Sequence, residues 1–233
     1  ARTVMEAFPG SLPARRHALH TGNPVRAEIT RLPAPADRFA ARTGALRVLV
    51  IGGSLGAHAL NEVMPAAVSQ LPSAQPLQLY HQTGSQDLAS VQAAYAALGR
   101  EARVDAFIDD MAAAYAWADV VVCRSGALTV AELAVVGVAA VLVPFPHATD
   151  DHQTGNARFL ADAGAAILMP QDTMSAEKLA GLLGDFSQQR NILLEMACRA
   201  RQLAMPDAAR RVAEQCLHAA GVEPRPVDTG AVA

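Results

Sequence analysis

The sequence predicts an α/β domain, a parallel sheet with helices on both faces, and three observations support this class. Alanine-rich segments of helical period separate short apolar runs, an alternation typical of strands joined by crossover helices. The runs are apolar almost throughout, as expected for strands that are buried on both faces. Right-handed crossovers would then place every strand-to-helix loop at one edge of the sheet. The expected strands cover residues 46–51, 77–81, 102–107, 119–123, 139–143 and 165–169.

Composition narrows the function classes. The 233 residues are 52% hydrophobic, which is enough for a substantial core, and carry a formal net charge of −3. An acidic balance without a lysine- or arginine-rich run argues against nucleic acid as a partner. Three widely spaced cysteines predict neither a disulfide framework nor a zinc site. No apolar stretch approaches the ~20 residues that cross a bilayer.

The chain is expected to divide into four segments. Its opening residues resemble a strand that leaves an earlier domain, and a Pro/Ala/Arg-rich stretch follows as a linker. Three helices close the main domain, at 175–184, 187–203 and 207–220, the last with Asp207 as its N-cap. A Pro/Gly-containing tail is expected to be disordered. The segments are 1–30 (end of a preceding domain and interdomain segment), 31–45 (linker), 46–220 (main domain) and 221–233 (tail).

The first loop that suggests a ligand-binding site is Gly52-Gly53-Ser54-Leu55-Gly56, which follows the strand at 46–51. Small residues between a strand and a helix leave backbone N–H groups free, and the helix dipole adds positive potential, so this turn suits a phosphate. It has neither the dinucleotide-binding glycine spacing nor the lysine of an ATP-binding loop. The alternative is that the glycines only form a tight turn.

A second such turn, Arg124-Ser125-Gly126, precedes the very apolar helix expected at 127–136. Two phosphate-binding turns at one sheet edge suggest a ligand with a phosphate chain between them. Glu132 is the only charge in that helix, and a buried carboxylate needs a hydrogen-bond donor. A ribose diol supplies two such donors. The alternative is that Glu132 faces water or pairs with an arginine.

A third loop, 144–156, is rich in polar side chains. Two histidines and two aspartates in it suggest a cation site, but Asp150 and Asp151 are better placed as N-caps of the next helix. Gln153 and Asn156 are candidates for binding sugar hydroxyls. The alternative is that the segment only caps a helix. We expect no metal.

The fourth candidate is the segment 107–111, at the end of another strand. Asp109 is expected to be the N-cap of the following helix, and Ile108 to offer apolar surface and main-chain groups to a flat base. Taken alone, this segment is equally compatible with a core isoleucine beside a cap.

Five motifs of the chain, taken in order, carry a resemblance: Gly22-Asn23-Pro24-Val25-Arg26, Gly52-Gly53-Ser54-Leu55-Gly56-Ala57, Phe107-Ile108-Asp109-Asp110-Met111, Arg124-Ser125-Gly126-Ala127-Leu128-Thr129-Val130-Ala131-Glu132 and Asp150-Asp151-His152-Gln153-Thr154-Gly155-Asn156-Ala157. Together they closely resemble the bacterial MurG family, and the resemblance covers about residues 1–220. That family transfers N-acetylglucosamine (GlcNAc) from UDP-GlcNAc to lipid I, undecaprenyl-diphosphate-MurNAc-pentapeptide, and so forms lipid II for peptidoglycan. It works as a peripheral enzyme on the cytoplasmic side of the bacterial inner membrane.

The resemblance implies a GT-B fold of two Rossmann-like domains, with this chain as the C-terminal, donor-binding half. Carried over by motif, Arg26 and Ser54 would contact the donor diphosphate region. Ile108 would present its main chain to uracil, Glu132 would bind the ribose, and Gln153 would hold the sugar. The residues that would line the nucleotide are Ala127, Leu128, Thr129, Val130, Ala131 and Glu132. The family needs no cofactor or bound metal.

The resemblance also implies what this sequence lacks. The acceptor site, the membrane-facing patch and the candidate catalytic base would belong to an N-terminal half, so the catalytic residues remain unknown. His147 and His152 are the nearest candidates for a base, but they would lie on the donor side. Two alternatives stay open: a non-catalytic UDP-GlcNAc-binding subunit that pairs with a separate acceptor-domain protein, and, less favoured, a nucleotide-sugar epimerase.

Overall fold

The computed structural model describes residues 3–40, 42–53, 56–148 and 151–222. Its strands are β1 (Met5–Glu6), β2 (Leu19–His20), β3 (Leu46–Ile51), β4 (Leu77–Gln82), β5 (Ala102–Asp105), β6 (Val120–Cys123), β7 (Ala139–Leu142) and β8 (Ala166–Leu168). Its helices are the 3-10 turn η1 (Ala14–Arg16), α1 (Ala27–Thr30), α2 (Pro35–Ala40), α3 (His58–Ser69), α4 (Leu88–Ala97), α5 (Met111–Trp117), α6 (Ala127–Val136), α7 (His152–Ala161), α8 (Ala176–Gln188), α9 (Arg190–Gln202) and α10 (Ala208–Ala219).

Strands β3 to β8 form one sheet in the order β5-β4-β3-β6-β7-β8, and every pair in it is parallel. Each of these strands lies within one or two residues of a run predicted from the sequence. The strand order reverses direction between β3 and β6. In open parallel sheets, the crevice at the carboxyl end of such a switch point is where ligands bind.

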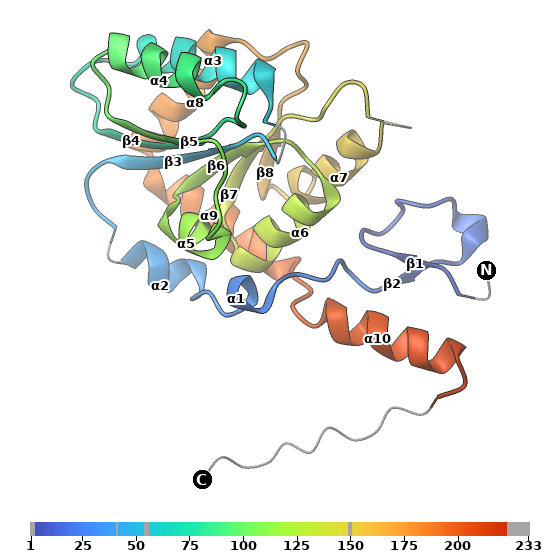
Figure 1. The fold of residues 1–233 in the computed structure, drawn as a ribbon. Helices are drawn as coiled ribbons and strands as arrows, with labels where there is room; N and C mark the ends of the chain where they lie inside the picture. The colour runs from blue at the N-terminus through green and yellow to red at the C-terminus, as the bar shows by residue number, and fades with distance from the viewer. Residues whose placement is uncertain (1–2, 41, 54–55, 149–150, 223–233) are drawn as a thin grey trace.

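Helices cover both faces of the sheet, which confirms the predicted fold class (Figure 1). Alternate residues of β3 point to opposite faces: Val48 and Val50 pack with α3, α4 and α8, while Leu49 packs with α5, α6 and α7. Helix α9 contributes to both cores, Leu193 to the first and Ala200 to the second.

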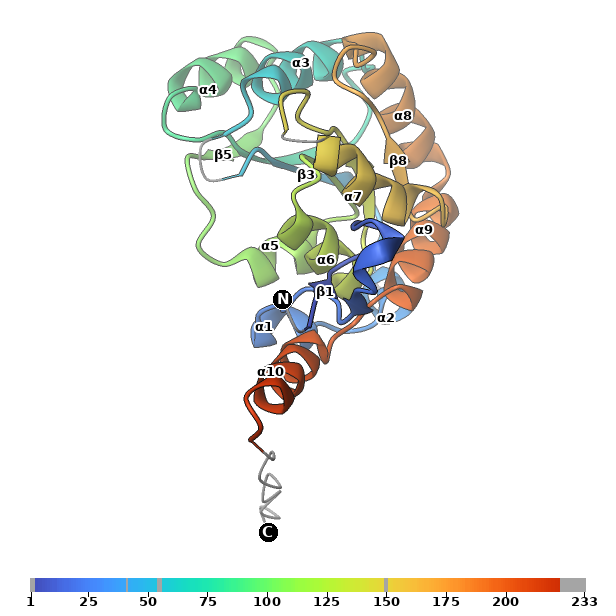
Figure 2. The same ribbon diagram turned by 90° about the vertical axis from the view of Figure 1, so that its right-hand side faces the viewer.

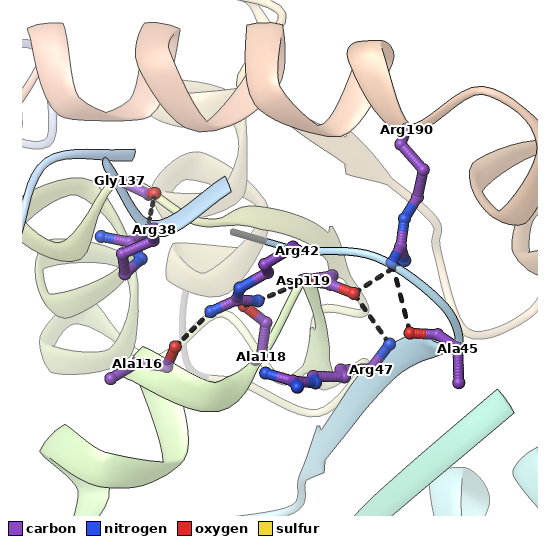
Figure 3. Close-up of polar contacts among 9 residues, drawn as sticks. All are labelled: Arg38, Arg42, Ala45, Arg47, Ala116, Ala118, Asp119, Gly137 and Arg190. Atoms are coloured by element: carbon purple, nitrogen blue, oxygen red, sulfur yellow. Dashed lines mark hydrogen bonds and ion pairs between the residues drawn. The ribbon is translucent and has the colours of Figure 1, made fainter. Parts of the chain in front are cut away.

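The start of β6 is fixed by a buried charge cluster, drawn in Figure 3. The carboxylate of Asp119 is fully buried and binds the guanidinium groups of Arg42 and Arg190, the latter at 2.7 Å, as well as the backbone N–H of Arg47 at 2.9 Å. Arg42 also donates to the backbone carbonyl of Ala116. One aspartate therefore joins β3, β6, α9 and the segment that precedes β3.

The stretch 31–45, expected as a linker, contains helix α2, which packs against α9. Its Arg38 is buried and donates to the carbonyl oxygens of Val136, at 2.8 Å, and Gly137, at the end of α6. Arg201 of α9 donates to the carbonyl of Val135. Cations at the carboxyl end of a helix satisfy its last carbonyls and its dipole, so this stretch anchors α6. The domain boundaries themselves remain predictions.

The N-terminal residues form a small two-stranded unit beside the main sheet. Strands β1 and β2 pair in parallel, and Phe8 packs its ring 4.8 Å from that of Phe159 in α7. Figures 1 and 2 show that α10 extends away from the sheet. Among the described residues, no helix is both long enough and apolar enough to cross a bilayer.

Candidate functional site

A cavity of about 720 Å³ opens at the switch point between β3 and β6. The glycine turn after β3 and the start of α3 form one wall, and the turn after β6 and the start of α6 form the other. The two turns predicted to face each other therefore share one cavity. Residues of the loop after β7 and of α7 close it, among them Phe145, His147 and Gln153.

The glycine turn is not the open phosphate cradle that the sequence suggested. The N–H groups of Gly52 and Gly53 both donate to Oε1 of Gln82, each at 3.1 Å, so the expectation that they are free is wrong. Gly56 has a φ of +79°, and a Cβ there would lie 2.0 Å from the carbonyl oxygen of Thr83, so only glycine fits this close approach. The first turn of α3 also lies on this wall, and its N-cap residue, Ala57, gives its N–H groups no side-chain hydrogen bond.

The opposite wall is the start of α6. Its N-cap is Gly126, which has no side chain to satisfy the first N–H groups of the helix. Arg124 lines the cavity beside it and is held by Gln171, whose Oε1 accepts from Nη2 at 2.6 Å. Burial lowers the pKa of Arg124, but a guanidinium keeps its charge at neutral pH. A cation and open helix N–H groups together form an anion-binding wall.

Glu132 lies one helical turn beyond Thr129 on α6, on the same side of the helix. Its carboxylate accepts a hydrogen bond from the phenol of Tyr115 at 2.9 Å, and it lies 3.6 Å from Nη2 of Arg26. Burial raises the pKa of Glu132, while Tyr115 and Arg26 oppose that shift. Tyr115 is therefore the hydrogen-bond donor that this buried carboxylate was expected to need. The alternative, that Glu132 pairs with an arginine, also holds, since Arg26 is that arginine. Its side chain is 14% exposed, so part of it remains accessible.

Two polar residues predicted from the loop after β7, Gln153 and Asn156, have different positions in the structure. Gln153 lines the cavity and accepts a hydrogen bond from the backbone N–H of Phe145 at 2.9 Å. Asn156 is buried and donates to the carbonyl of Ser125 at 3.0 Å, so the suggestion that it faces a sugar is wrong. Asp151 holds the N-cap position of α7. Asp150 lies outside the described residues.

Ile108 lies on the far side of β4 from the cavity. Its side chain is buried in the core beside α5 and borders a separate groove of about 1270 Å³ along β5. The N-cap of α5 is Asp110, which accepts from the N–H of Ala113 at 2.8 Å, and not Asp109 as expected. The cap shifts because the helix starts one residue later than the sequence suggested.

The predicted site residues therefore fall into groups. Thr129 and Gln153 line the cavity, Ala127 and Leu128 lie in the first turn of the same helix, and Val130 and Ala131 are buried behind them. Glu132 and Arg26 meet one turn away. Ser54 lies outside the described residues. Among those described, no group of three or more His, Cys, Asp or Glu side chains is arranged to hold a metal.

Sequence reasoning missed Arg124, Gln82 and Tyr115. Arg124 was visible in the motif at the second turn, but nothing in the sequence shows that an arginine there faces a cavity. Gln82 and Tyr115 act from the end of β4 and from α5, and only the packing of these elements against the turns reveals them.

A parallel sheet with helices on both faces and a cavity at its switch point, between β3 and β6, is a Rossmann-like domain, and a GT-B glycosyltransferase consists of two such domains. Residues 47–212 match the family model described as the glycosyltransferase family 28 C-terminal domain. The chain belongs to this family, as its C-terminal domain.

Comparison with named relatives gives a narrower similarity than the family model does. It is 50% identical over 222 residues to a protein of Nitrosospira multiformis and 56% identical over 220 residues to one of Bordetella parapertussis. Both are named UDP-N-acetylglucosamine–N-acetylmuramyl-(pentapeptide) pyrophosphoryl-undecaprenol N-acetylglucosamine transferase. These matches cover 95% and 94% of the chain but only 62% and 60% of the relatives.

The crystal structure of Acinetobacter baumannii MurG superposes with a TM-score of 0.82 at 44% identity, covering 92% of this chain and 60% of that one. The resemblance to the MurG family that the five motifs predicted is therefore confirmed. The chain spans about three fifths of the length of the relatives that it matches.

Proposed function

We propose that this chain is the donor-binding half of a glycosyltransferase that transfers GlcNAc from UDP-GlcNAc to lipid I to form lipid II. The observation that carries the proposal is the cavity at the switch point, whose walls are the N-termini of α3 and α6 and the guanidinium of Arg124. Those groups complement a diphosphate. The names of the relatives supply the identity of the sugar and the acceptor.

In this proposal the donor lies along the carboxyl edge of the sheet. Its uracil meets the main chain of Ile108, its ribose meets Glu132, and its sugar meets Gln153, with the diphosphate between the two helix N-termini. Arg26 and Ser54 are proposed for the diphosphate region as well. The ion pair of Arg26 with Glu132 at 3.6 Å brings that arginine to the ribose end, so its contact with a diphosphate would depend on a change of side-chain rotamer.

The proposed reaction is a single inverting displacement, in which an acceptor hydroxyl attacks the anomeric carbon and UDP leaves. Negative charge builds on the diphosphate as the glycosidic bond breaks, so the helix N-termini and Arg124 stabilise the transition state more than the ground state. The base that takes the acceptor proton, the acceptor site and the peripheral membrane contact on the cytoplasmic face are proposed to belong to an N-terminal half. The isolated chain is therefore expected to bind donor and to transfer little or no sugar.

Calorimetric titration of the 233-residue chain with UDP-GlcNAc and UDP tests donor binding, with ADP as the control ligand. We expect both uridine nucleotides to bind and ADP not to. Glu132→Ala should weaken UDP binding by about 1.5–3 kcal/mol, the value of a hydrogen bond to a charged group. Equal affinity of wild type and variant would remove the proposed ribose contact. Transfer to a soluble lipid I analogue should appear only when an acceptor domain is supplied.

A further inference from the structure

One buried side chain connects the glycine turn that leads into α3, beside the proposed diphosphate position, with the loop that leads to Ile108, the proposed uracil contact. Gln82 ends β4 and is 3% exposed. Its Oε1 accepts from the N–H groups of Gly52 and Gly53, at 3.1 Å each. Its Nε2 donates to the carbonyl oxygens of Gly53 and Ala106, at 2.9 Å each.

These contacts use the whole hydrogen-bonding capacity of the amide at two acceptor and two donor positions. Three of the four bonds, two to Oε1 and one from Nε2, hold the glycine turn after β3. The second bond from Nε2 holds Ala106, which follows β5 and stands two residues before Ile108. No other amino acid has the same set of donors and acceptors at this length. The shorter amide of asparagine would not reach both loops.

Backbone bonds also tie each of the two loops to β4. The N–H of Gly52 donates to the carbonyl of Gln82 at 3.4 Å. The N–H of Gly84 donates to the carbonyl of Ala106 at 3.1 Å, which ties the loop after β5 to β4. The glycine turn approaches the same strand at Gly56, which packs against the carbonyl of Thr83. Gln82 adds a side chain that bonds to both loops at once.

We propose that Gln82 is a positioning residue that sets the spacing between the diphosphate and uracil subsites. The inference rests on the proposed function, because it assigns those subsites to the loops that Gln82 joins. A ligand that occupies both subsites, such as UDP, gains from their correct spacing, since its second contact forms within one molecule. A ligand that occupies only one subsite gains nothing from it.

The test compares UDP with uridine and with inorganic pyrophosphate on the full chain, by calorimetry and by ligand-observed NMR for the weak ligands. Gln82→Met keeps the length of the side chain and removes all four hydrogen bonds. We expect it to raise the Kd of UDP about tenfold, because the spacing of the two loops is no longer fixed before UDP binds, and to change the Kd of uridine and of pyrophosphate less than about twofold. Tyr95→Phe, which removes a buried bond to His81 on the same strand, is the control for lost stability alone and should leave all three affinities unchanged.

A second variant tests the same hydrogen bonds through the pH dependence of UDP binding. Gln82→Glu places a carboxyl opposite the carbonyl oxygens of Gly53 and Ala106, and burial raises the pKa of such a carboxyl. Its neutral form regains an O–H donor, whereas its anion has none. The UDP affinity of this variant, relative to wild type, should therefore recover as the pH falls from about 8 to about 5.5.

Each outcome decides the inference. UDP binding equal to wild type in Gln82→Met, or a loss shared equally by UDP, uridine and pyrophosphate, overturns the positioning role while donor binding by the wild type stands. Should Gln82→Met fail to fold, a Gln82→Glu affinity that does not recover at low pH overturns it instead. Wild-type chain that binds no UDP would overturn the proposed function, and with it this inference.

Discussion

The phenol of Tyr115 donates a hydrogen bond to Oε2 of Glu132 at 2.9 Å, from α5 to α6. Tyr115 is 1% exposed, and burial is the main reason that its pKa lies well above the ordinary value. A phenol that stays protonated is a permanent donor. Tyr115 therefore holds the one acidic side chain of α6 in a fixed orientation, with the other carboxylate oxygen turned to the Arg26 side.

Tyr115→Phe is expected to weaken UDP binding about tenfold, because Glu132 loses the donor that fixes its carboxylate in place before the ribose binds. The loss should be specific for the ribose hydroxyls, so binding of 2′,3′-dideoxy-UDP should hardly change. Titration calorimetry with both nucleotides measures the difference. Equal losses for the two ligands would mean that Tyr115 supports the fold and not the orientation of Glu132.

Glu132→Gln should change how stability depends on pH. Burial raises the pKa of Glu132 above the 4.5 of an ordinary glutamate, so between these two values the folded chain binds more protons than the unfolded chain. Wild-type stability is therefore expected to fall as the pH rises through this window. The Tm of the variant minus that of wild type should be more positive at neutral pH than near pH 4. A difference independent of pH would contradict the buried position of this carboxylate.

His81 should make the chain sensitive to mild acid. It is fully buried between Tyr95 and Asn61, with ring-nitrogen contacts of 3.1 and 3.0 Å, and burial lowers its pKa from 6.5 to about 4. The unfolded chain binds the proton first, so stability is complete above pH 6.5 and declines as the pH falls toward 4. The full shift corresponds to about 3 kcal/mol.

Denaturant titrations of wild type and His81→Gln across this window measure the effect. The stability advantage of wild type over the variant should shrink as the pH falls from 6.5 to 4. An advantage that stays constant would show that the imidazole is not held neutral in the fold.

Asp119→Asn should destabilise the chain by about 3–5 kcal/mol, because it leaves buried guanidinium groups without their carboxylate. Arg42 and Arg190 both bind Asp119, and their side chains are 8% and 25% exposed (Figure 3). Chemical denaturation measures the loss. Glu214→Gln removes the exposed pair with Arg210 on α10 and is the matched control, for which we expect little change. A similar effect of both substitutions would contradict the role of the buried cluster.

The sheet was predictable because each of its strands is a short apolar run that is buried on both faces, and the intervening segments have helical period. The runs at 46–51 and 139–143 needed no tertiary information to be recognised as strands. The location of the cavity was predictable for a similar reason. Parallel strands with right-handed crossovers bring their carboxyl-end loops to one edge, so Gly126 and Gln153 had to approach the glycine turn.

Hydrogen-bond partners were not predictable in this way, because they depend on which side chain reaches a group from another element. The N–H groups of Gly52 and Gly53 were expected to be free for a phosphate, but Gln82 occupies them from β4. Asn156 was expected to face the cavity, but it bonds to Ser125.

The sequence by itself determined the order of strands and helices, the edge at which the ligand cavity opens, and the family. Tertiary structure alone decided which polar groups remain available in that cavity and how Tyr115 and Arg26 flank Glu132. It also decided how Arg38 and Arg42, in a stretch expected to be a linker, join that stretch to the end of α6 and to Asp119 at the start of β6. The physical reason is the range of the interactions. Hydrophobic periodicity is a property of neighbouring residues and can be seen in the sequence. A buried hydrogen bond joins groups that only packing brings together.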